Sequence, residues 1–269
     1  MDRPIGGAGA APPNPPGGPA HPLYLPGTSP LHRARPQCKI AASLLFVLAV
    51  VATPREAFWA FGLYALALVG VARIGQVPLA LLARRLVIEL PFLLFAVFLP
   101  FVGHGARVEV LGVPLAVGGL WAAWNIVVKG TLGVATSAIL AATTPVAELL
   151  GGLERLRLPK ALTTIAGFMI RYADVIADEV RRMRIARISR GHDPRWIWQA
   201  RAIAASAGAL FIRSYERGER VYLAMVSRGY AGSMPVLQDL GATRGQWLTA
   251  LSLPAAAALV AATAWGVRP

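Results

Sequence analysis

Cysteine and charge are both scarce in this 269-residue sequence, and each shortage excludes a class of protein. The single cysteine, Cys38, excludes an intrachain disulfide and a zinc site built from several cysteines. Charged residues make up 15% of the chain and hydrophobic residues 56%, whereas soluble domains carry about 25% charged and about 45–50% apolar residues. The mean hydropathy is +0.55. This composition predicts a membrane protein.

Acidic residues and histidines are also few. The 13 Asp and Glu stand against 27 Lys and Arg, which gives a formal net charge of +14. Such a hydrophobic and basic chain is typical of a membrane protein with one charged aqueous face. No two of the four histidines lie at helical ligand spacing, so we expect no metal site. The sequence has no Gly-x-x-x-x-Gly-Lys-Ser/Thr motif, so we expect no P-loop for ATP.

Proline and glycine are concentrated at the start of the chain. Residues 1–30 contain nine prolines and six glycines, a composition that predicts a disordered leader. Hydrophobic runs follow and predict an all-α membrane protein with about five transmembrane helices, four within residues 31–143 and one within 244–269. The runs cover residues 40–53, 57–72, 86–102, 113–143 and 246–267. The run 113–143 is either one strongly tilted helix or an interfacial piece followed by a span over 126–142.

Positive charges are distributed unevenly among the loops, and this asymmetry predicts the orientation of the chain. The segment before the first run and the loop between the second and third runs are rich in arginine, whereas the other two loops contain Arg55 and Arg107 almost alone. Sixteen Lys and Arg lie between Ala142 and Gln246. Because cytoplasmic loops are enriched in Lys and Arg, we expect a multi-pass protein of the cell membrane with a cytoplasmic N-terminus.

The basic segment, residues 144–243, contains two long helical patterns and is expected to form a cytoplasmic domain. Apolar residues recur every three or four positions, which predicts one helix from Pro159 to Gly191 and a second over about 195–228. We expect the apolar stripes to pack the two helices together and against another membrane subunit. The residues that represent this face are Phe168, Tyr172, Phe211 and Met225.

Both predicted helices end in the same three residues. The first ends in Ser189, Arg190 and Gly191, and the second in Ser227, Arg228 and Gly229. In one interpretation these are ordinary helix caps, with a left-handed glycine and an arginine bound to the terminal carbonyls. In the other, the planar guanidinium groups are presented to carboxylates of a partner protein.

At these motifs the sequence resembles the transmembrane T component of energy-coupling factor (ECF) transporters, the EcfT/CbiQ family, in its cobalt-type branch. The resemblance rests on residues 186–191, on the run 213–217 that leads to 224–230, and on the entry segment 29–33 with Pro36 and Lys39. Members of this family carry short arginine-glycine motifs at the ends of two coupling helices, and these motifs dock into two ATP-binding-cassette (ABC) ATPases.

The resemblance implies a non-catalytic coupling subunit of an ATP-driven importer, with no catalytic residue and no cofactor of its own. Its implied partners are two ABC-type ATPase subunits, which bind the ATP, a substrate-capturing S-type membrane subunit and the lipid bilayer, but no nucleic acid. The substrate implied by the cobalt-type branch is Co²⁺ or Ni²⁺, and a vitamin is the alternative.

Two other classes of protein remain open on the residues themselves. Asp174, Asp178 and Glu179 share one predicted helix, as in a metal-binding prenyltransferase motif, so a membrane-embedded enzyme is the first. The chain has no second acidic cluster, however, and Asp178 is expected to pair with Arg182 four residues later. The second is a conventional ABC permease that forms its own translocation path.

Two charged residues fall within hydrophobic runs. Glu89 is expected to reach the membrane interface by snorkelling, because it lies near the inner end of the run 86–102. The role of Lys129 is left open.

Overall fold

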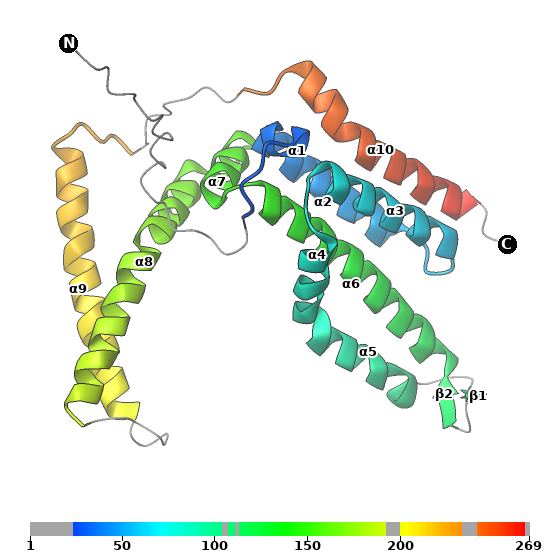
Figure 1. Ribbon diagram of the computed structural model, residues 1–269, viewed down its shortest axis with the longest axis horizontal. Coiled ribbons are helices and arrows are strands. Elements are labelled where there is room, and N and C mark those ends of the chain that lie inside the picture. Colours follow the sequence, from blue (N-terminus) through cyan, green and yellow to red (C-terminus); the bar gives the residue numbers. More distant parts are fainter. Residues whose placement is uncertain (1–23, 104–106, 111–112, 192–199, 233–240, 267–269) are drawn as a thin grey trace, which may run out of the picture.

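Helices form almost all of the described chain (Figure 1). The computed structural model describes residues 24–103, 107–110, 113–191, 200–232 and 241–266. Its helices are α1 (Pro30–Arg33), α2 (Pro36–Ala52), α3 (Phe58–Ile74), α4 (Leu79–Leu86), the 3-10 helix η1 (Val87–Glu89), α5 (Leu90–Val102), α6 (Val117–Thr143), α7 (Val146–Arg155), α8 (Lys160–Ser189), α9 (Ala200–Val226) and α10 (Arg244–Gly266). Strands β1 (Arg107–Val110) and β2 (Val113–Ala116) form a short antiparallel hairpin.

The prediction of an all-α membrane protein is confirmed. Within the described residues, three helical segments are long and apolar enough to cross a bilayer: Leu79–Val102, Val117–Thr143 and Arg244–Gly266. The apolar helices α2 and α3 have 17 residues each, or about 25 Å at 1.5 Å per residue. Large apolar side chains such as Leu48 and Leu66 are exposed on the outside of the bundle, as expected for surfaces that face lipid.

The hydrophobic run 113–143 forms a strand followed by one continuous helix. β2 takes residues 113–116, and α6 takes the next 27 residues. The helix is about 40 Å long, whereas the hydrocarbon core of a bilayer is about 30 Å thick. α6 is thus one continuous helix, as in the first alternative, although residues 113–116 form a strand. Its tilt stays a prediction, because a helix of this length fits the core either by tilting or by projecting from it.

The third span begins earlier than predicted. α4, η1 and α5 form one span from Leu79 to Val102, whereas the hydrophobic pattern predicted a start at Leu86. The reason is Arg85, which is only 8% exposed and whose guanidinium donates to the carbonyl oxygen of Ala138 in α6 at 2.6 Å. Arginine inside a span is tolerated when it faces the bundle and binds a backbone carbonyl, so here it does not mark a loop.

α2 lies at the centre of the bundle and packs against α10, α7 and α6. Phe46 and Val50 of α2 are fully buried, and the Phe46 ring meets the ring of Tyr64 in α3 edge-on, with 5.7 Å between centroids. The Tyr64 hydroxyl donates to the carbonyl oxygen of Ala257 in α10 at 3.0 Å and lies 2.9 Å from the hydroxyl of Thr53. This one side chain therefore joins α2, α3 and α10.

Two lysines bind carbonyl groups near the carboxyl ends of α2 and α6. Lys39, near the start of α2, donates to the carbonyl oxygen of Thr143 at the end of α6, at 3.0 Å. Lys129 of α6 donates to the carbonyl oxygen of Val51 near the end of α2, at 2.7 Å. The last carbonyls of a helix lack intrahelical donors, and the helix dipole favours a cation there. Lys129 is therefore a capping residue for α2, which runs antiparallel to α6.

Glu89 is buried against α6, so the prediction that its side chain snorkels to the membrane interface is wrong. It ends η1 and is 4% exposed. Thr131 of α6 donates a hydrogen bond to one of its carboxylate oxygens at 3.0 Å. The other oxygen lies so close to Gly130 that a Cβ atom there would clash with it. The prediction failed because the span begins at Leu79, which places Glu89 near the middle of its length.

The long helices α8 and α9 extend away from the bundle as a hairpin (Figure 1). α8 packs against α7 and α9 and begins directly after Pro159 as predicted. α9 is described from Ala200 onward, and the predicted residues 195–199 lie outside the described part of the chain. At the joint between α7 and α8, Arg157 has a left-handed backbone with φ 72°.

Most of the predicted leader, residues 1–23, lies outside the described residues. Its last part contacts the bundle, because the Leu25 N–H donates to the carbonyl oxygen of Ala142 at 2.9 Å. The His32 ring lies 2.9 Å from the carbonyl oxygen of Leu25 and 2.7 Å from the hydroxyl of Ser29, the N-cap of α1.

The close approach of α5 to α6 provides a test of the fold. A Cβ at Gly119 would clash with the carbonyl oxygen of Leu99 and come within 2.7 Å of the Cα of Pro100. Gly119→Ala is therefore expected to lower the thermal unfolding midpoint of the detergent-purified chain, since overpacking costs about 1–3 kcal/mol. Gly133→Ala on the same helix is the control, because a Cβ there meets nothing within 4 Å. A Gly119→Ala midpoint as high as that of Gly133→Ala would contradict the packing.

Candidate functional site

The end of α9 is closed by two hydrogen bonds of a Schellman motif. Gly229 has a φ of 85°, its N–H donates to the carbonyl oxygen of Val226 at 3.0 Å, and the Tyr230 N–H donates to that of Met225 at 3.0 Å. These bonds satisfy carbonyls that the helix leaves without donors. A side chain is strained at this φ, so glycine is the residue that the cap requires.

The end of α8 has the same glycine bond, and the residue after Gly191 lies outside the described part of the chain. Gly191 has a φ of 77°, and its N–H donates to the carbonyl oxygen of Ile188 at 2.9 Å. The hydroxyls of Ser189 and Ser227 each donate to a carbonyl of their own last turn, at 3.0 and 3.1 Å. The recurring Ser-Arg-Gly sequence therefore produces two equivalent helix ends.

The arginine side chains take no part in either cap. Arg190 and Arg228 each donate their backbone N–H to the last turn, but both side chains are exposed. With the described residues, neither guanidinium forms a hydrogen bond or an ion pair, so the expected bonds to terminal carbonyls are not seen there. Each helix end thus presents five N–H donors to the solvent, in a geometry that suits carboxylates or carbonyls of another protein.

The two arginines lie at opposite ends of the α8–α9 hairpin (Figure 1). α8 has 30 residues and α9 has 27, so the helices are about 45 and 40 Å long. Because they run in opposite directions, Arg190 is at the tip of the hairpin and Arg228 is at the other end. The two guanidinium groups are therefore on the order of 40 Å apart.

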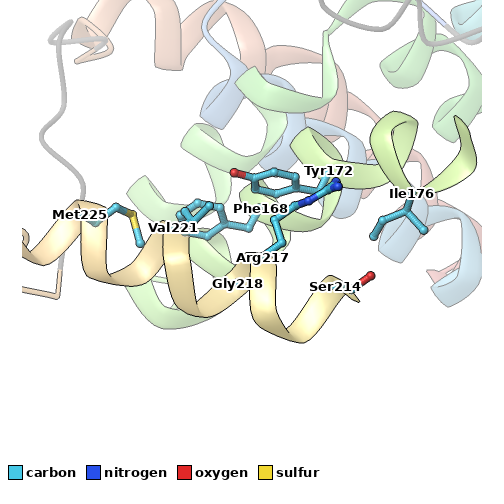
Figure 2. Close-up of a pocket in the computed structure, with 8 residues that line it drawn as sticks. All are labelled: Phe168, Tyr172, Ile176, Ser214, Arg217, Gly218, Val221 and Met225. Carbon is cyan, nitrogen blue, oxygen red and sulfur yellow. The ribbon is translucent and has the colours of Figure 1, made fainter. Parts of the chain in front are cut away.

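An apolar groove of about 260 Å³ lies between α8 and α9 (Figure 2). Phe168 and Tyr172 of α8 stack in it with 6.3 Å between ring centroids, and Met225 lines it from α9. Arg217 also lines the groove, although sequence analysis noted it only within the run 213–217. Three of the four apolar residues expected to share a face therefore do lie between the helices.

Phe211 is separate from this groove, with a side chain that is 72% exposed. Met169 and Leu223 are similarly exposed on the surface of the hairpin. The α8–α9 hairpin thus has an internal apolar groove and several apolar side chains exposed on its external surface. A stripe of residues three or four apart does not show which of these two positions each residue takes.

Two of the three acidic residues of α8, Asp178 and Glu179, form ion pairs. Asp178 binds Arg181 at 2.7 Å, three residues away, and not Arg182 as predicted. Glu179 pairs with Arg182 at 3.8 Å and with Arg213 of α9. Arg213 therefore links the two helices, a role that sequence analysis did not recognise. Among the residues that the structure describes, no group of three or more His, Cys, Asp or Glu could hold a metal ion.

Comparison with known proteins gives several relatives. The cobalt transport protein CbiQ of Rhodobacter capsulatus is 32% identical over 164 residues, which are 61% of this chain and 65% of that protein. The transmembrane protein EcfT of the energy-coupling factor transporter of Thermanaerovibrio acidaminovorans is 30% identical over 226 residues, which are 78% of this chain and 82% of that one. The corresponding protein of Bacillus selenitireducens is 26% identical over 227 residues, with 78% and 82% covered.

The matched lengths differ among these relatives. An uncharacterized protein of Methanocaldococcus jannaschii matches over 40% of each chain, so this chain spans less than two thirds of the length of that relative and of the Rhodobacter protein. The sequence profile of the family described as cobalt transport protein matches residues 27–237, which include both Ser-Arg-Gly ends. The chain therefore belongs to the CbiQ family of cobalt transport proteins.

Proposed function

We propose that the chain is the membrane coupling subunit of an ATP-driven importer of the energy-coupling factor type. The observation that carries the proposal is the pair of capped helix ends at which Arg190 and Arg228 are exposed. Two equivalent ends, on the order of 40 Å apart, suit two equivalent ABC ATPase subunits. The names of the EcfT relatives support the same type of transporter.

The coupling follows from the rigidity of the hairpin. ATP binds to the ATPase subunits, because the chain has no P-loop of its own. Movement of the ATPases pulls or pushes the two helix ends, and the caps keep those ends from fraying. The ion pair between Glu179 and Arg213 joins the helices, so they move together and transmit the motion to the bundle through α7, against which α8 packs.

The external apolar surface of the hairpin is the proposed contact with an S-type capture subunit. Phe211, Met169 and Leu223 are exposed on helices that otherwise carry many charges. Large exposed apolar patches rimmed by polar residues mark interaction sites. The capture subunit selects the substrate, for which we propose Co²⁺ or Ni²⁺ on the basis of the family description, with a vitamin as the alternative.

Replacing the two arginines tests the ATPase contact. Arg190→Ala and Arg228→Ala are each expected to weaken co-purification of the ATPases and metal uptake, and the double variant more strongly. The reason is that losing a buried charged hydrogen bond across an interface costs about 2–5 kcal/mol. Lysine at either position should rescue only in part, because a point charge cannot form the bidentate pair.

Arg184→Ala is the matched control, since Arg184 is also an exposed arginine of α8 but lies inside the helix. It should leave the ratio of ATPase to coupling subunit unchanged. Thermal unfolding of each variant separates loss of docking from loss of a cap, which would cost about 1 kcal/mol within this chain. ATPases that co-purify at wild-type stoichiometry with the double variant would refute the role of these arginines.

Phe211→Asp tests the capture-subunit contact. Because the side chain is exposed in the isolated chain, the free energy of unfolding should change by no more than about 0.5 kcal/mol. Binding of the capture subunit should fall strongly, because the charge would be buried without a partner in the complex. Phe211→Leu, which remains apolar, should bind normally. Normal recovery of the capture subunit with Phe211→Asp would show that the surface lies elsewhere.

The proposed orientation has a cytoplasmic N-terminus, and cysteine labelling tests it. In a Cys38→Ala background, a cysteine at Ala209 should react with an impermeant maleimide only after the cells are opened. A cysteine at Glu56, in the exposed turn between α2 and α3, should react in intact cells. The reverse pattern would invert the topology.

A further inference from the structure

A second groove lies within the membrane bundle, away from both arginine ends. Its volume is about 420 Å³. It is formed by the first halves of α2 and α10 and the last halves of α3 and α6, with α1 at its rim. These parts all belong to the same end of the antiparallel bundle, which is the cytoplasmic end in the proposed orientation.

Along α2 and α10 the lining of this groove changes from polar to apolar with depth, whereas α6 places Thr136 at the deep end and α3 places Ile74 at the rim. On α2 the lining begins with Arg35 and Lys39 and ends with Phe46, and on α10 it begins with Gln246 and ends with Leu253. Arg35 and Phe46 are 11 positions apart, or about 16 Å along a helix. Half the hydrocarbon core of a bilayer is about 15 Å. The groove is thus as deep as one leaflet, and its α2 and α10 walls have the polarity profile of a lipid molecule.

The charge at the rim of the groove is positive. Its lining includes two cations, Arg35 and Lys39, and no carboxylate. Lys39 already donates to the carbonyl oxygen of Thr143 and is balanced by Glu148. Arg35 is half-buried and has no ion pair with the described residues. Its guanidinium is therefore the cation left for a ligand, and a phosphate group matches its geometry.

We propose that this groove binds one anionic phospholipid of the cytoplasmic leaflet. The headgroup phosphate binds Arg35, and an acyl chain lies along the deep end between Phe46 and Leu253. A zwitterionic lipid offers the same acyl chains, but its ammonium group lies beside the phosphate and offsets the attraction. Preference for the anionic headgroup is therefore what distinguishes this site from the general lipid contact of the bundle.

Native mass spectrometry of the delipidated full chain tests the proposal. The chain is offered equal amounts of phosphatidylglycerol and phosphatidylcholine with identical acyl chains, and the retained lipids are counted. The wild type should retain one phosphatidylglycerol in preference. Arg35→Gln should lower the ratio of the two lipids about fivefold. Arg73→Gln should leave the ratio unchanged, because Arg73 is an exposed arginine at the same end of the bundle but outside the lining.

Blocking the groove with a large side chain provides a second, independent test of the proposal. Ala42→Trp fills the middle of the lining and should abolish retention of both lipids. Leu45→Trp, on the exposed face of the same helix, should not. If Ala42→Trp is not monodisperse, the comparison of Arg35→Gln with Arg73→Gln decides the question.

Three outcomes would overturn the proposal. The first is equal retention of the two lipids by the wild type. The second is a lipid ratio in Arg35→Gln that matches that in Arg73→Gln. The third is an Ala42→Trp chain that keeps its lipid but loses a partner subunit from the assembled transporter, which would make the groove a protein interface. The first two readouts use the isolated chain and do not depend on ATPase docking, so they are separate from the tests of the proposed function.

Discussion

Carbonyl groups at helix ends and inside a bilayer lack hydrogen-bond donors, and this bundle supplies donors to several of them from its own cations. Lys39 and Lys129 bind carbonyls near the ends of α6 and α2, and Arg85 binds a carbonyl inside α6. Arg85 gains a partner that it could not find in lipid, and each of the three contacts ties two helices together. The antiparallel arrangement of α2 and α6 and the position of α4 against α6 depend on these contacts.

The bundle and the hairpin differ in how much of their apolar surface is buried within the chain. Buried hydroxyls, aromatic rings and close glycine contacts hold the bundle together, as the contacts of Tyr64 and Gly119 show. The hairpin has few buried residues, and α8 buries only Thr163 fully among its 30 residues. Much of the apolar surface of α8 and α9 is therefore exposed in the isolated chain, which is the expected condition of a segment whose stability is completed by partner subunits.

Much of this arrangement follows from local sequence signals. The two 30-residue patterns and their glycine ends specify α8 and α9, because caps and periodicity depend on neighbouring residues alone. The early start at Leu79 and the burial of Glu89 did not follow, because both depend on α6, which supplies Ala138 to Arg85 and Thr131 to Glu89. Helical spacing alone also did not predict that Asp178 pairs with Arg181, because it allows partners both three and four residues away.

The joint between α7 and α8 has a mechanical consequence. Arg157 is held in a left-handed conformation, and Pro159 fixes the backbone just before α8 begins. A pivot here lies at one end of a stiff rod about 45 Å long, so a tilt of about 5° carries the opposite end through roughly 4 Å. In the proposed coupling role this geometry is a lever with its long arm on the side of Arg190, and a displacement of several ångströms at the tip corresponds to a rotation of a few degrees at the joint.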